Sequence, residues 1–93
     1  MSRETKTVKL DQLQALIEAG AILDAFIIED QDGRFHVLCR SVKGVDHRIE
    51  TKRGELRSFK TLDTAARLLR DLGISKMRLH MCEFAPGNTP LLR

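Results

Sequence analysis

Hydrophobic residues recur at helical spacing near the start of the chain. Leu13, Leu16 and Ile17 fall on one face of such a helix. Asp11 is suited to cap its beginning, and Gly20 is suited to end it. The pattern predicts a short helix of about two turns, which needs tertiary packing to form.

A longer apolar stripe lies in the second half of the chain. Thr61 is a favourable cap for this helix, Asp63 lies near its positive end, and Gly73 stops it. The stripe consists of Leu62, Ala65, Ala66, Leu69 and Leu72. Its spacing predicts an amphipathic helix that packs one face on the rest of the molecule.

The segments between and after the helices follow the patterns of β-strands. Residues 21–29 are apolar at both parities, which is typical of a strand at the centre of a sheet. Residues 34–40 and 45–50 alternate apolar with polar side chains, and turns containing Gly33 and Gly44 link the three segments. We therefore expect three antiparallel strands in a meander. A last alternating strand is expected at residues 76–82.

These elements define a small single-domain α+β protein in the order helix, three strands, helix, strand. We expect an antiparallel three-stranded meander with the helices packed on one face. The domain should span residues 8–84, with a flexible N-terminus over residues 1–7 and a flexible tail over residues 85–93.

Composition narrows the classes of protein. Of the 93 residues, 42% are hydrophobic and 31% charged, which is typical of one soluble globular domain. The aromatic residues, 4% of the chain, are all phenylalanine, and this argues against a stacking platform for single-stranded nucleic acid. The two cysteines do not resemble a disulfide framework. The N-terminus is polar and no apolar run approaches the ~18 residues of a membrane span. We expect a cytoplasmic protein without membrane contact.

Positive charge is concentrated in the middle of the sequence. Residues 34–60 contain eight basic and three acidic residues and so carry +5, whereas the whole chain carries +3. By alternation, Arg34, His36 and Arg40 share one strand face, and Arg48 lies on the polar face of the next strand. A basic sheet face of this kind could bind the phosphates and base edges of DNA. The candidate contacts are Arg34, His36, Arg40, Lys43, Arg48, Lys52, Arg53 and Arg57.

A second interpretation of the same residues stays open. Asp46 and Glu50 lie on the polar face of their strand and could pair with the arginines across strands. The charge would then belong to a solvated surface with no ligand.

Enzymatic chemistry has little support in the sequence. No serine–histidine or cysteine–histidine pair stands out, and His47 is expected to point inward. Cys39, Cys82 and the histidines do not have the spacing of a metal site, and there is no glycine-rich phosphate loop. We expect a non-enzymatic protein without catalytic residues, metal or cofactor.

Two resemblances follow from the segment that joins the basic strands to the second helix. Phe59, Thr61 and Ala65 make a step from sheet to helix that resembles the DNA-binding domains of plant ethylene-response factors and the arm-binding domains of tyrosine recombinases. In those families the sheet contacts DNA, which implies roles for Arg34, Arg40 and Arg48. The tryptophans and the arginine pattern of the plant domain are missing here.

The second resemblance covers about residues 8–83. The segments LDQLQALIEAGAI and RSFKTLDTAARLLRDLGISKMRL resemble small plasmid partition-associated proteins of the ParC type. The resemblance implies an accessory protein of a bacterial plasmid or mobile element, with DNA and proteins of a plasmid maintenance system as partners. The alternative is a protein-interaction module or inhibitor of a larger complex, without nucleic-acid contact. A homodimer is also compatible with so small a core.

Overall fold

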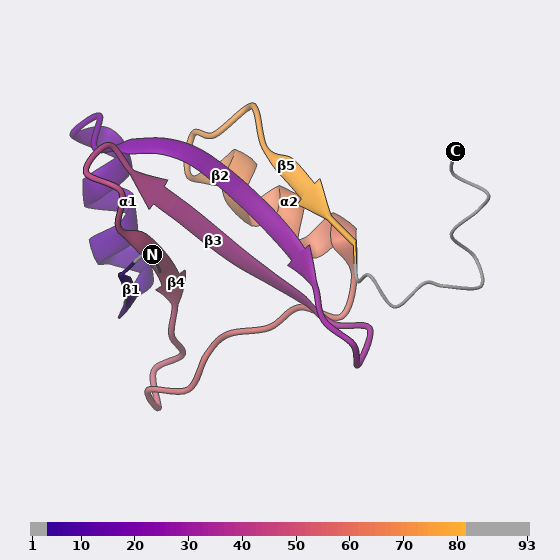
Figure 1. Ribbon diagram of the computed structural model, residues 1–93. Coiled ribbons are helices and arrows are strands. Elements are labelled where there is room, and N and C mark those ends of the chain that lie inside the picture. The colour runs from indigo at the N-terminus through magenta and orange to yellow at the C-terminus, as the bar shows by residue number, and fades with distance from the viewer. Residues whose placement is uncertain (1–3, 82–93) are drawn as a thin grey trace.

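The frame of the molecule is a twisted five-stranded sheet with both helices behind it (Figure 1). The computed structural model describes residues 4–81. In chain order the elements are β1 (Thr5–Val8), α1 (Leu10–Glu18), β2 (Ile22–Glu29), β3 (Phe35–Ser41), β4 (Asp46–Ile49), α2 (Leu62–Asp71) and β5 (Arg78–His80).

The sheet is mixed, and this corrects the expected three-stranded antiparallel meander. The strand order is β1-β4-β3-β2-β5, with β2, β3 and β4 paired antiparallel as predicted. The two outer strands are parallel to their neighbours: β1 pairs with β4, and β5 pairs with β2. Both outer pairings join segments that are distant in the sequence, such as Thr5 with Asp46 and Phe26 with Arg78, so no local turn signal marks them.

Strand β1 lies largely within residues 1–7, the segment that we expected to be flexible. Its side chains are polar and mostly exposed, so hydrophobic alternation does not mark it. Backbone hydrogen bonds hold it instead: the amide of Asp46 donates to the carbonyl of Glu4, and the amide of Glu50 donates to the carbonyl of Val8, both at 2.9 Å. The tail expected at residues 85–93 lies outside the described residues.

The helix beginnings follow their capping chemistry, with one correction. Helix α1 begins at Leu10 after Lys9, and the Gln12 side chain accepts a hydrogen bond from the Lys9 amide at 2.9 Å. The predicted cap at Asp11 was therefore wrong by two residues. The Thr61 cap of α2 is confirmed, because its hydroxyl accepts a hydrogen bond from the Thr64 amide at 3.2 Å.

The main core lies between the helices and one face of the sheet. The whole predicted stripe of α2 points into it, and α1 contributes Leu13 and Ile17 of its predicted stripe. Its buried members are Leu13, Ala25, Ile27, Val37, Cys39, Ile49, Phe59, Ala65, Leu69 and Leu72. Within residues 4–81, neither helix has the length and hydrophobicity that crossing a bilayer requires.

Glycines shape the two hairpin turns as predicted. Gly33 and Gly44 have φ angles of 84° and 87°, a left-handed region that glycine enters without a steric cost. The Gly33 amide donates to the carbonyl of Asp30, just after β2, and the Gly44 amide donates to the carbonyl of Ser41, at the end of β3. These turns fix the register of β2, β3 and β4, and so decide which side chains face away from the helices.

Removing a helix contact to the sheet should destabilise the whole domain. Leu69 is fully buried in the core, so Leu69→Ala should lower the free energy of unfolding by about 2–5 kcal/mol. Urea denaturation followed by circular dichroism measures the change. Arg67→Ala, on the exposed face of the same helix, should change stability by less than about 0.5 kcal/mol. Equal effects of the two variants would contradict this assignment of the core.

Candidate nucleic-acid interface

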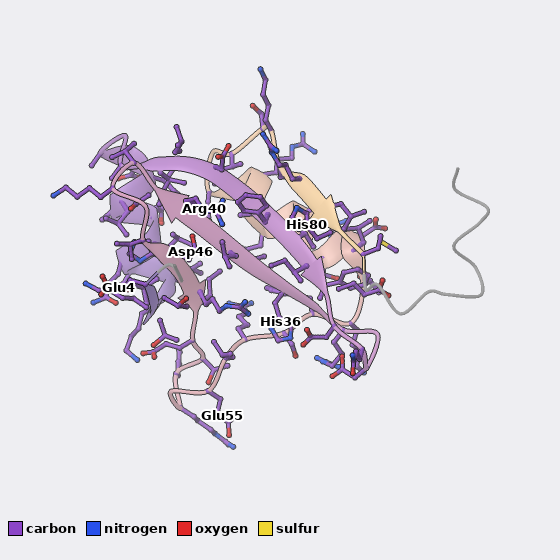
Figure 2. The ribbon with its side chains drawn as sticks, viewed as in Figure 1. Glu4, His36, Arg40, Asp46, Glu55 and His80 are labelled. Atoms are coloured by element: carbon purple, nitrogen blue, oxygen red, sulfur yellow. The ribbon has the colours of Figure 1, made fainter. Side chains whose placement is uncertain are left out.

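The sheet face opposite the helices, which we call the open face, has its own small apolar centre. Phe26 and Leu38 are paired in register on neighbouring strands, and both are buried although neither belongs to the main core. The Arg40 guanidinium lies over the Phe26 ring, 4.8 Å from its centroid. The His80 ring meets Phe26 edge-on at 5.2 Å, and Figure 2 shows Arg40 and His80 on either side of this region.

Charged side chains thus cover the apolar residues of the open face, as the helices cover those of the opposite face. A long arginine side chain can cover apolar surface with its methylene stem while its charge stays in water. The Phe26 ring is consequently enclosed and offers no flat surface to a nucleotide base. Any ligand of this face would meet guanidinium and imidazole groups first.

Arg40, a predicted contact, is held by a carboxylate of the neighbouring strand. Its Nε donates to Asp46 Oδ1 at 2.8 Å, and the two residues are register partners on β3 and β4. The hydrogen bond to Asp46 raises the pKa of Arg40 further above its already high value. This pair fulfils the cross-strand pairing that we kept open as an alternative, and it compensates one of the expected DNA-binding charges.

His36 and Arg34 are also engaged within the protein. His36 Nε2 lies 2.6 Å from Asp30 Oδ2, at the turn between β2 and β3. Arg34 Nε donates to Ser58 Oγ at 2.7 Å, and the Arg34 amide donates to Asp32 at 2.9 Å. With Asp30 and Asp32 beside them, these residues lie at an acidic corner of the open face.

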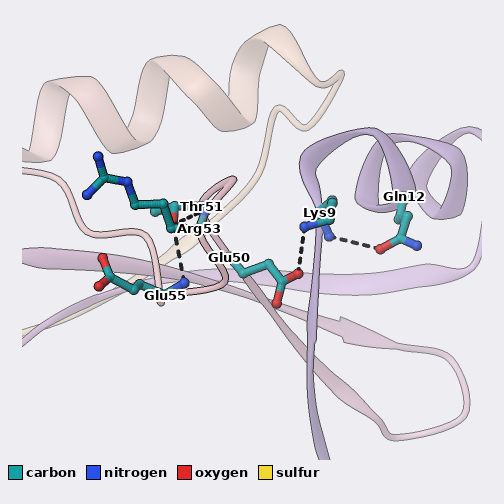
Figure 3. A network of polar contacts seen from close by, with 6 residues as sticks. All are labelled: Lys9, Gln12, Glu50, Thr51, Arg53 and Glu55. Carbon is teal, nitrogen blue, oxygen red and sulfur yellow. Dashed lines mark hydrogen bonds and ion pairs between the residues drawn. The ribbon is translucent and has the colours of Figure 1, made fainter.

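Arg48 differs from the other basic residues of the open face. It lies on β4 between Asp46 and Glu50, and both of these carboxylates already have a cation: Arg40 for Asp46, and Lys9 for Glu50 at 3.1 Å (Figure 3). Within residues 4–81, Arg48 itself makes no ion pair with a carboxylate. The positive charge of Arg48 is therefore not compensated locally.

The remaining candidates lie at the turns and on the helix side. Lys43 is exposed in the turn before β4, and Lys52 and Arg53 are exposed in the turn after it. The backbone of the second turn is fixed by Thr51, whose hydroxyl accepts hydrogen bonds from two amides (Figure 3). The Arg57 guanidinium is 5.2 Å from the centroid of the core residue Phe59. Arg57 and Lys52 both line a hollow of about 450 Å³ beside α1.

The sequence analysis missed two basic residues of the open face. Arg78 and His80 lie on β5, which pairs with β2 so that Arg78 is the register partner of Phe26. The alternation of residues 76–82 placed them on one strand face, but only the parallel pairing with β2 brings that face beside Phe26 and Arg40. The side chain of Arg78 is exposed.

The residues considered for chemistry do not converge. Burial raises the pKa of the Cys39 thiol to about 12, so the reactive thiolate is scarce at neutral pH. His47 is buried, as predicted, and its Nδ1 has no hydrogen-bond partner within the part of the chain that the structure describes. No group of three potential metal ligands is found among residues 4–81.

No protein-family model, curated protein or solved structure matches this chain. The two family resemblances stay predictions, and the function is argued from the geometry of the open face.

Cys39 should be unreactive while the protein is folded. In a Cys82→Ser variant, where Cys39 is the remaining thiol, a disulfide reagent at pH 8 should react only after denaturant is added, because burial suppresses the thiolate. Absorbance of the released thiol follows the reaction. Rapid labelling of the native protein would show that Cys39 is accessible.

The ion pair between Lys9 and Glu50 should be visible in the titration of the carboxyl group. A hydrogen bond from Lys9 holds the pKa of Glu50 below its ordinary value. A depressed native pKa adds stability above the unfolded pKa, and this stability is lost as the pH falls through the native pKa. Lys9→Met should return the pKa of Glu50 upward, measured by NMR of the side-chain carboxyl carbon. An unchanged pKa of Glu50 in this variant would contradict the role of Lys9.

Proposed function

We propose that this protein is a non-enzymatic DNA-binding accessory protein that contacts a duplex through the β4 side of its open face. The observation that carries the proposal is Arg48, an uncompensated guanidinium between two carboxylates that are both neutralised by other cations. Exposed lysine and arginine side chains lie at both ends of the same strand. Such an arrangement attracts a polyanion without first breaking an internal ion pair.

The dimensions of this strand suit the major groove. From the turn that holds Lys43 to the turn that holds Lys52 and Arg53, the chain extends over about six residues, or ~20 Å at ~3.3 Å per residue. The major groove is ~12 Å wide, so the turn cations can reach the backbones on both sides while Arg48 lies over the groove. Phosphate contacts from the turns would fix the orientation, and Arg48 is the residue type that binds guanine with two hydrogen bonds.

The other parts of the open face favour binding of a duplex over a single strand, and they favour one position of the DNA on the sheet. Phe26 is enclosed by Arg40 and His80, so it offers no stacking surface to an unpaired base. Asp30 and Asp32 make the β2–β3 turn acidic and would repel phosphates there. DNA should therefore lie along β4, with Arg34 and His36 contributing little.

The resemblance to plasmid partition-associated proteins of the ParC type suggests the biological process in which this DNA binding takes part. We propose a role in the maintenance or partition of a bacterial plasmid or mobile element. The alternative, an interaction module without nucleic-acid contact, is favoured by the apolar side chains exposed at the β5 edge, Leu79 and Met81.

The proposal is tested by fluorescence anisotropy with a random duplex of 30 base pairs at several salt concentrations. Phosphate contacts from the three turn cations predict that the logarithm of the binding constant falls with the logarithm of salt at a slope of about −3. Arg48→Glu should lower the affinity by about tenfold or more at low salt, because it places a negative charge over the groove.

The matched control is Arg67→Glu, a charge reversal on the exposed face of α2, on the opposite side of the sheet. It changes the net charge equally but should leave binding nearly unchanged. Melting curves establish that both variants are folded. Equal losses in the two variants would reduce the effect to net charge, and no binding of wild-type protein at low salt would refute the proposal.

A further inference from the structure

Strand β5 forms an outer edge of the sheet with side chains that suit pairing with another strand. All three of its residues are exposed. Leu79 is 44% exposed and the following Met81 is 60% exposed, although leucine and methionine are usually buried. An edge strand also presents backbone amides and carbonyls that lack a strand partner on its outer side.

The opposite edge, β1, is protected in the usual way. It carries charged, exposed side chains, with Lys6 Nζ 3.6 Å from the Glu4 carboxylate. Lysine and other charges on an edge strand discourage pairing with a second sheet. The two edges of one sheet thus differ, and only the apolar side chains of the β5 edge favour association.

We propose that β5 pairs antiparallel with β5 of a second copy of this chain, around a two-fold axis at Leu79. The axis follows from the alternation. Leu79 lies on the helix side of the strand with Met77, which packs against the main core, and continued alternation places Met81 on the same side. Arg78 and His80 lie on the open face. Rotation about Leu79 reproduces this pattern on the second copy, so the edge is complementary to itself.

The resulting cross-strand pairs are apolar on the helix side and avoid an arginine–arginine pair on the open face. On the helix side, Leu79 lies opposite its own copy and Met77 lies opposite the second copy's Met81, which makes a continuous apolar row. Met77 already packs against the main core, and Leu79 is the register partner of the core residue Ile27. On the open face, Arg78 lies opposite the second copy's His80, so the two arginines are not directly paired.

This dimer does not depend on the DNA-binding proposal. The two proposals differ in the expected effect of salt. Pairing of sheet edges in line keeps both open faces on the same side. Burial of apolar side chains between two basic strands should be strengthened by added salt, because salt screens the repulsion between Lys76, Arg78 and their copies. DNA binding should instead weaken as salt rises.

Sedimentation equilibrium of the full chain, from low to several hundred micromolar, tests the proposal. A small edge-to-edge interface predicts a monomer–dimer equilibrium in the micromolar range or weaker. Leu79→Glu should shift the protein to monomer by at least tenfold in dissociation constant, and Met81→Glu should act in the same direction. Leu23→Glu is the matched control, since Leu23 is 64% exposed on β2 away from this edge, and its dissociation constant should equal that of wild type.

Hydrogen exchange then locates the interface. Raising the protein concentration should slow exchange at the amides of residues 78–80 and should not change exchange at residues 5–8 of the opposite edge. A monomer at all concentrations, or equal weakening by the Leu23 and Leu79 variants, would overturn the proposal. Slowed exchange at residues 5–8 in place of 78–80 would overturn it as well.

Discussion

Two short helices cover only one face of the five-stranded sheet, so the other face has to shield its own apolar side chains. It does so with charged groups: Arg40 lies over Phe26, and His80 closes the ring from the side. A buried aromatic residue under a guanidinium gains cation–π energy of about 0.5–2 kcal/mol. The same guanidinium is also paired with Asp46 on the neighbouring strand.

This constraint separates the basic residues of the open face into two groups. Arg34, His36 and Arg40 serve the fold, since each is bound to a neighbouring strand or turn. Among the described residues, the side chains of Arg48 and the turn lysines make no such contact, and these residues lie along β4 and at its two ends. Positive charge in the sequence is therefore a poor measure of binding capacity, because what matters is the charge that internal ion pairs leave uncompensated.

The same sheet explains why binding and self-association can use different surfaces. The candidate DNA surface follows β4, next to the charged edge strand β1, whereas the apolar edge is β5 at the other end of the sheet. Two strands, β3 and β2, separate β4 from β5. The molecule could therefore hold a second copy at β5 and leave the Arg48 region free.

The sequence by itself determined both helices, the β2–β3–β4 meander and the turn glycines, because helical periodicity, alternation and positive φ are local properties. It could not reveal β1, whose polar residues are held by backbone bonds to β4, or the parallel place of β5 beside β2. Long-range pairing also limited what the sequence could predict about the basic residues of the open face. Alternation grouped Arg34, His36, Arg40 and Arg48, but only the tertiary structure decided which of them are compensated, because ion pairs depend on register across strands.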